Sequence, residues 1–178
     1  VVVVSMAERL ASSTVAHLTA ALDLACVVVE RDGVTARPPA RLGLTLLDEG
    51  VADDEQVADA LRDRLAFHVD LDDAARGEAV GSRRDASDIA RARRDLADVA
   101  CGDEIVTALC EVAMALGIAS VRAPFLALKA ARASAALHGR SRIEDIDAAI
   151  AARLVLAPRA IRLPTGEPPQ EGDGHSDD

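Results

Sequence analysis

Clear stop signals divide the second half of the chain into four helix-length segments, and this feature restricts the fold most. Gly117 and Gly139 each follow a helical pattern, and Pro158 follows the last one. Glycine readily adopts the left-handed conformation that ends many helices, whereas proline cannot continue a helix. Ser141 and Glu144 have the spacing of a capping box for the last segment. We therefore predict a bundle of four helices over residues 87–99, 103–116, 122–137 and 143–156.

The first half alternates between strand-like and helical patterns. It opens with four consecutive valines, a run that is typical of a buried strand. Asp32-Gly33 lies between two short β-type runs and supplies the positive φ angles of a tight hairpin turn. We predict strands at residues 1–4, 27–30, 34–37, 42–47 and 67–71, and helices at residues 7–22 and 54–65. This half is therefore expected to be α/β.

Composition and turn signals divide the chain into four parts. We expect an α/β part over residues 1–75, a polar linker over 76–86, the four-helix part over 87–164 and a disordered acidic linker, rich in Pro and Gly, over 165–178. The last part holds five of the 30 acidic residues and no Lys or Arg, which leaves 25 acidic residues against 20 basic ones elsewhere. The part expected to fold is therefore only mildly acidic.

The composition argues against several classes of function. Nucleic-acid binding is not expected, because the chain has a net charge of −10 and only two Phe, with no Trp or Tyr, to stack on bases. Its apolar runs are too short for a membrane span. The three cysteines form no C-x-x-C motif and the four histidines share no ligand spacing, so no metal site and no disulfide framework are predicted. We expect a cytoplasmic protein.

Residues 116–164 closely resemble the helical lid of magnesium-chelatase D subunits; the sequence there is LGIASVRAPFLALKAARASAALHGRSRIEDIDAAIAARLVLAPRAIRLP. Upstream, VVVERDGVTARPPARLGL at residues 27–44 is similar to the hairpin that chelatase-type AAA+ proteins place before sensor 1, and ADALRDRLAFHVDL at residues 58–71 is similar to another segment of that family. The resemblance implies an AAA+ α/β core fragment followed by a helical lid. The chain has no nucleotide-binding P-loop motif; if the protein has one, it is expected upstream of residue 1.

The positions that hydrolyse ATP in active relatives differ in this chain. Those relatives end a strand with Asp-Glu, because one carboxylate holds the Mg²⁺ of ATP and the other polarises the attacking water. Ser5-Met6 stands at that place, and Leu46-Leu47-Asp48 stands where an Asn usually contacts the γ-phosphate. The resemblance therefore implies a subunit that does not hydrolyse ATP.

Two arginines match functional positions of the family. Arg64 matches the arginine finger, which reaches into the ATP site of a neighbouring subunit, and Arg122 matches sensor 2 of the lid. A guanidinium suits both roles because it stays charged and offers forked donors to phosphate oxygens. The residues alone also allow a simpler reading, in which Arg64 offsets the dipole at the end of a helix and Arg122 is a solvated residue in a first helical turn.

The resemblance implies a non-hydrolysing assembly subunit of magnesium chelatase, a ligase complex that inserts Mg²⁺ into protoporphyrin IX in (bacterio)chlorophyll biosynthesis. Its partners would be the I-type ATPase subunit, in a hetero-oligomeric ring, and the porphyrin-binding H-type subunit. The complex would need ATP and Mg²⁺, whereas this segment would bind neither tightly and would have no activity alone. Two alternatives are a fragment of a MoxR-like AAA+ ATPase and a helical protein-interaction module.

Overall fold

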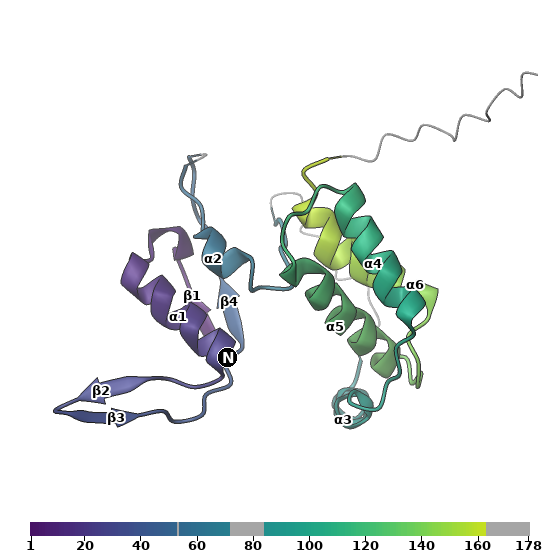
Figure 1. The fold of residues 1–178 in the computed structure, drawn as a ribbon, viewed down its shortest axis with the longest axis horizontal. Coiled ribbons are helices and arrows are strands. Elements are labelled where there is room, and N and C mark those ends of the chain that lie inside the picture. Colours follow the sequence, from purple (N-terminus) through teal and green to yellow (C-terminus); the bar gives the residue numbers. More distant parts are fainter. Residues whose placement is uncertain (53, 72–83, 163–178) are drawn as a thin grey trace, which may run out of the picture.

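The computed structural model describes residues 1–52, 54–71 and 84–162. Figure 1 shows two groups of elements, one with the strands and the helices α1 and α2, the other with the helices α3 to α6. This arrangement confirms the predicted fold class, an α/β part followed by a helical part. The predicted acidic linker, 165–178, and most of the predicted linker 76–86 lie outside the described residues, so the domain boundaries stay predictions.

Two short parallel strands run through the first group. β1 (Val2–Val4) pairs with β4 (Leu44–Leu46) along the full length of both strands. Parallel strands need a crossover connection between them, and α1 (Ser12–Leu24) supplies its helix. The predicted helix 7–22 begins later than expected, because a 3₁₀ turn at Ala7–Arg9 and two extended residues precede α1. Both strands end at the same edge of the sheet.

A small apolar cluster lies between these strands and helices. Its buried side chains are Ala7, Val15, Val57 and Leu61. Leu61 is fully buried and belongs to α2 (Asp59–Arg62), which packs beside α1. The cluster therefore fixes the position of the turn after α2, which carries Asp63 and Arg64.

The predicted hairpin is confirmed. β2 (Val29–Arg31) and β3 (Val34–Ala36) pair antiparallel, and Figure 1 shows them at the tip of an arm that leaves the first group below α1. Asp32 and Gly33 have φ angles of 53° and 76°. These positive values are the ones that a tight turn between two short strands requires, and they are the reason for the Asp-Gly pair.

Two predictions for the segment after β4 were wrong. The predicted helix 54–65 is reduced to α2, because Val57 N donates to Asp48 Oδ2 at 3.4 Å and Ala58 has a non-helical ψ of 130°, which keeps the residues before α2 in a loop. Residues 67–71 form no strand in the described part of the chain. Phe67 and Val69 alternate with His68 but are exposed, and alternation alone supplies no neighbouring strand to pair with.

Four helices form the second group, and α5 (Arg122–Leu137) matches its predicted range in full. α5 packs against α3 (Ala86–Asp95), α4 (Asp103–Ala115) and α6 (Asp145–Ala151). Fully buried alanines recur every fourth residue along α5, at Ala123, Ala127, Ala131 and Ala135. This spacing places them on one face, and their small side chains let the neighbouring helices approach closely.

The ends of these helices confirm some predictions and correct others. Gly117 and Gly139 have φ angles of 70° and 72°, as expected for left-handed residues after a helix. The capping box is not formed by Ser141 and Glu144; Glu144 is itself the N-cap of α6, and Asp147 is its partner. The last helix continues beyond α6 as a π-helical turn at Ala152–Leu156 and a 3₁₀ turn that ends at Arg159.

None of the helices in the described part of the chain is both long and apolar enough to cross a membrane.

Candidate functional site

The structure brings both predicted site arginines together on one carboxylate, that of Asp23. Arg64 binds it with two forked donors: Nε lies 3.0 Å from Oδ1 and Nη2 lies 2.5 Å from Oδ2. Arg122 Nη1 lies 3.3 Å from the same Oδ1. Asp23 was not predicted from the sequence, and it makes a single cluster of two residues that are 58 positions apart.

Asp63 holds the other side of Arg122. Arg122 Nε lies 3.2 Å from Asp63 Oδ2, and the hydroxyl of Ser120 donates to Asp63 Oδ1. The backbone N–H of Arg122 donates in turn to Ser120 Oγ at 3.2 Å. Arg122 is therefore oriented by its own backbone turn and by carboxylates from both α1 and the turn after α2.

Three elements position this cluster. Asp23 is the last residue but one of α1, Arg64 follows α2, and Arg122 is the first residue of α5. Arg64 Nη1 also donates to Ala60 O at 2.7 Å, so Arg64 helps to satisfy the carbonyl end of α2 as well as contacting Asp23. The cluster therefore joins the α/β group to the helical group.

The charges of Asp23 and Arg64 stabilise each other. The hydrogen bond from Arg64 is the main reason that the pKa of the Asp23 carboxyl lies below its ordinary value, with the charges of Arg64 and Arg122 acting in the same direction. The hydrogen bond to Asp23 likewise raises the pKa of Arg64 above its usual range. Both groups are therefore charged at neutral pH.

Solvent reaches this cluster. The side chain of Arg64 is 18% exposed, that of Asp23 33% and that of Arg122 47%. A cavity of about 310 Å³ lies beside them and is lined by Leu22, Asp23, Arg64, Arg122, Phe125, Leu126 and Lys129. Three of these side chains are cationic and one is anionic. The cavity therefore presents a surplus of positive charge, which suits an anionic ligand.

A second contact between the two groups involves Arg159. Its Nη1 donates to Ala66 O at 3.0 Å, and its Nη2 donates to Leu65 O. The ring of His68 lies beside it, with Nε2 3.1 Å from Arg159 Nη2. Burial is the main cause that lowers the pKa of His68, and the positive charge of Arg159 adds to it. His68 is therefore neutral at physiological pH.

The residues that follow β1 and β4, where active relatives are expected to carry the residues that hydrolyse ATP, bind backbone groups instead. Met6 follows β1 with a left-handed φ of 49°, and its N–H faces Glu49 Oε1 at 3.4 Å. The side chain of Glu8 is 1% exposed, and its Oε2 accepts the N–H of Glu49 at 3.1 Å. Glu8 and Glu49 therefore hold the ends of the two strands together through backbone N–H groups.

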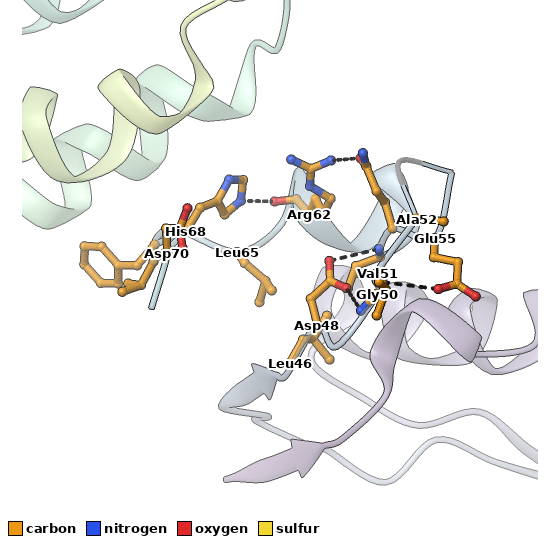
Figure 2. Close-up of a pocket in the computed structure, with 14 residues that line it drawn as sticks. Leu46, Asp48, Gly50, Val51, Ala52, Glu55, Arg62, Leu65, His68 and Asp70 are labelled. Carbon is orange, nitrogen blue, oxygen red and sulfur yellow. Dashed lines mark hydrogen bonds between the residues drawn. The ribbon is translucent and has the colours of Figure 1, made fainter. Parts of the chain in front are cut away.

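Asp48, the acidic residue of the stretch Leu46-Leu47-Asp48 where sensor 1 was expected, also binds backbone. Figure 2 shows it at the start of the loop after β4, where its carboxylate accepts the N–H of Gly50 at 3.2 Å and that of Val57 at 3.4 Å. The loop lines a cavity of about 630 Å³. His68 and Arg62 line the same cavity, and His68 Nε2 lies 3.0 Å from Arg62 O. Asp48 shapes the loop that lines this cavity.

Comparisons with known proteins agree on one family. Residues 106–177 match the family model of the AAA lid domain. The magnesium-chelatase 60 kDa subunit of Cereibacter sphaeroides is 41% identical over 96% of this chain, and that of Rhodobacter capsulatus is 38% identical over 95%. The 67 kDa subunit of Chlorobaculum parvum is 34% identical over 96%. The chain spans 28% of the length of the first two and 30% of the third.

A solved structure has a similar fold. It is the structure of a protein from Cytophaga hutchinsonii that is described as an ATPase by prediction. It superposes on this chain with a TM-score of 0.62, over 88% of this chain and 57% of its own length. The two sequences are 15% identical, so this likeness concerns the fold alone. On the sequence comparisons, the chain belongs to the family of the magnesium-chelatase 60 and 67 kDa subunits and contains an AAA lid domain.

Proposed function

We propose that this chain is part of a non-hydrolysing AAA+ assembly subunit of magnesium chelatase, which supports the ATP-dependent insertion of Mg²⁺ into protoporphyrin IX in (bacterio)chlorophyll biosynthesis. In this proposal Arg64 acts as an arginine finger toward the nucleotide of a neighbouring subunit, and Arg122 contacts the same nucleotide as a sensor-2 residue. The porphyrin and the Mg²⁺ that it receives are handled elsewhere in the complex.

The convergence of Arg64 and Arg122 on the carboxylate of Asp23 is the observation that carries the proposal. Two guanidinium groups that already share one anion have the geometry to share a phosphate group, because carboxylate and phosphate oxygens accept the same forked donors. The exposed fraction of both arginines leaves them within reach of a ligand from outside the chain.

The carboxylates at the described strand ends support the proposal, because most of their oxygens are already engaged. A bound Mg²⁺ needs carboxylate oxygens that are free to coordinate it or its waters. Here both oxygens of Asp48 and one oxygen each of Glu8 and Glu49 face backbone N–H groups. The other oxygen of Glu8 lies 3.5 Å from Arg9 Nε, and Ser5-Met6 stands at the end of β1 in place of the acidic pair. This arrangement supports a subunit that completes a partner's site, and it disfavours the alternative of a MoxR-like ATPase that hydrolyses ATP at these residues.

The partners follow from the same proposal. The I-type ATPase subunit would bind and hydrolyse ATP next to Arg64 in a hetero-oligomeric ring in the cytoplasm, and the H-type subunit would bind the porphyrin. ATP and Mg²⁺ would serve the complex, and this chain alone would have no chelatase activity. Metal insertion makes nitrogen–metal bonds, so the whole complex would be a ligase.

The test is the steady-state ATPase rate of the I-type subunit with this chain added. Wild type would be compared with Arg64→Ala, and with Arg62→Ala as a matched control, since Arg62 is a nearby arginine whose partners are Asp59 and Gln56. Sedimentation would show whether each variant still associates. We expect Arg64→Ala to change the rate about tenfold or more, because an arginine finger in trans can be worth about 10³ to 10⁵ in rate.

Three results would decide between the alternatives. Association with a rate that depends on Arg64 and not on Arg62 supports the shared nucleotide site. Association with equal rates for all three proteins would indicate a helical interaction module that has no contact with nucleotide. Absence of association would contradict a role for this chain as an assembly subunit.

A further inference from the structure

We propose that Asp23 is an internal anion that occupies the place of a phosphate group between Arg64 and Arg122, and that a phosphate-bearing ligand displaces it. This inference rests on the proposed function, because it concerns the same two arginines. It adds a residue, Asp23, and a regulatory role: in the absence of ligand, Asp23 keeps the two arginines oriented and neutralised.

The geometry of Asp23 resembles that of a bound oxyanion. One oxygen, Oδ1, receives both arginines, with Arg64 Nε at 3.0 Å and Arg122 Nη1 at 3.3 Å, and the other oxygen receives Arg64 Nη2 at 2.5 Å. These are forked contacts of the kind that guanidinium groups make with phosphate. A phosphate oxygen at the position of Oδ1 would satisfy the same donors.

One of the two helix ends beside Asp23, the start of α5, favours an anion at this place. Asp23 lies in the last turn of α1, where the negative end of the helix disfavours a carboxylate. Arg122 is the first residue of α5, where the positive end of the helix disfavours a cation but favours an anion. Arg122 and the start of α5 thus attract an anion at this place, whereas the end of α1 opposes any anion there, so the attraction comes from the arginines and α5.

The charge around the cavity favours an exchange of Asp23 for a more highly charged ligand. Arg64, Arg122 and Lys129 line it, against the carboxylate of Asp23 in the lining and that of Asp63, which lies 3.2 Å from Arg122 Nε. A phosphate or pyrophosphate group carries more negative charge than one carboxylate, so in place of Asp23 it would compensate the remaining positive charge better. Displaced Asp23 would not be buried without a partner, because its side chain already has 33% exposure.

Displacement would loosen one of the links between the two groups of elements. Asp23 belongs to the α/β group and Arg122 to the helical group, so their ion pair is one of the contacts that hold the groups together. The contacts of Asp63 with Arg122 and Ser120, and those of Arg159, would remain. Anion binding would therefore be coupled to the position of α5 relative to α1, and this coupling works in both directions.

The experiment is a calorimetric titration of the whole 178-residue chain with inorganic pyrophosphate at low salt. Wild type would be compared with Asp23→Asn, which keeps the shape of the side chain and removes its charge. Asp59→Asn is the matched control, because it makes the same change in net charge at a side chain that is 100% exposed. Asp23→Asn/Arg64→Ala would show whether any added affinity depends on Arg64.

We expect Asp23→Asn to bind pyrophosphate about five- to tenfold more tightly than Asp59→Asn, as expected when a competing, partly exposed ion pair is removed. The double variant should lose this gain. Equal affinity of the two single variants, or the absence of binding to both, would overturn the inference. The titration uses no partner, so the proposed ATPase role could still stand if it failed.

A second measurement on wild type covers the case in which Asp23→Asn does not fold. The N–H signals of Arg64 Nε and Arg122 Nη1, the two groups that face Asp23 Oδ1, would be followed by ¹H–¹⁵N NMR during addition of pyrophosphate. The inference expects both signals to shift along one common saturation curve, because both donors exchange Asp23 for the same anion. Shifts in neither signal, or in only one of them, would contradict it.

Discussion

Two arginine–carboxylate pairs in this chain have the same chemistry and very different surroundings. Asp147, inside the helical group, is 0% exposed and accepts from Arg140 Nε at 3.1 Å, Arg140 Nη2 at 2.6 Å, Ser134 Oγ at 2.7 Å and Glu144 N at 3.2 Å. Asp23, between the two groups, is partly exposed and receives two arginines. A buried acid with all its hydrogen bonds made within one group serves the fold, whereas a solvated acid between groups can be exchanged for a ligand.

Replacing Asp147 should have the largest effect on stability. Asp147→Ala leaves the buried hydroxyl of Ser134 unpaired and takes one partner from Arg140, which is 24% exposed and keeps Glu144, so we expect a loss of about 1–3 kcal/mol. Denaturant unfolding followed by circular dichroism would measure the loss. If Asp147→Ala lowered the unfolding free energy by less than about 1 kcal/mol, Asp147 would contribute no more to stability than we expect of Asp23.

The dependence of stability on pH should sharpen the same contrast. Burial alone raises the pKa of Asp147, but the hydrogen bonds from Arg140, Ser134 and Glu144 outweigh it, so the net pKa is lowered. A carboxyl with a lowered pKa in the folded state stabilises the protein above its unfolded pKa of about 3.9, and this contribution is lost as the pH falls through the folded value.

We therefore expect the difference in unfolding free energy between wild type and Asp147→Asn to be constant from about pH 6 to 8 and to shrink below about pH 4. Urea unfolding at a series of pH values would measure it. A difference that instead grew as the pH fell would mean that the folded protein holds Asp147 in its neutral form.

Replacing Asp23 should have the smallest effect on stability. Asp23→Asn removes a partly exposed ion pair at the junction, and such pairs contribute about 0–1 kcal/mol. Thermal unfolding beside the Asp59→Asn control would show the difference. A loss as large as that for Asp147→Ala would assign Asp23 a structural role and would weaken its assignment as an exchangeable anion.

Much of the helical part could be predicted from the sequence because its signals are local. α5 has its buried alanines on one face and Gly139 two residues after its end, so its range was predicted in full. The capping box was assigned one turn too early. Glu144 and Asp147 also satisfy that spacing, and the buried contact of Asp147 with Arg140 selects them.

The α/β part was less predictable because long-range contacts decide it. The start of the predicted helix 54–65 is held in a loop by the carboxylate of Asp48, and the alternating residues 67–71 find no neighbouring strand in the described part of the chain. A sequence pattern gives the face that each side chain would occupy, but it does not say whether a partner strand is there.

For the site, the family resemblance gave Arg64 and Arg122 separately, and their common partner was missed. A signal for Asp23 was nevertheless present. An acid in the last turn of a helix and an arginine at the start of another both oppose the helix dipole, so each indicates a specific partner of opposite charge. That the two charges pair with each other depends on the packing of α1 near α5, which no local pattern specifies.

The most direct test of the central claim is an electron cryo-microscopy structure of this chain in a ring with the I-type ATPase subunit and a non-hydrolysable ATP analogue. The distances to measure join the guanidinium groups of Arg64 and Arg122 to the phosphate oxygens of the neighbouring nucleotide. We predict that both lie within hydrogen-bond distance of those oxygens and that Asp23 has been released. Arginines that stay on Asp23, with the phosphates bound by other residues, would contradict the claim.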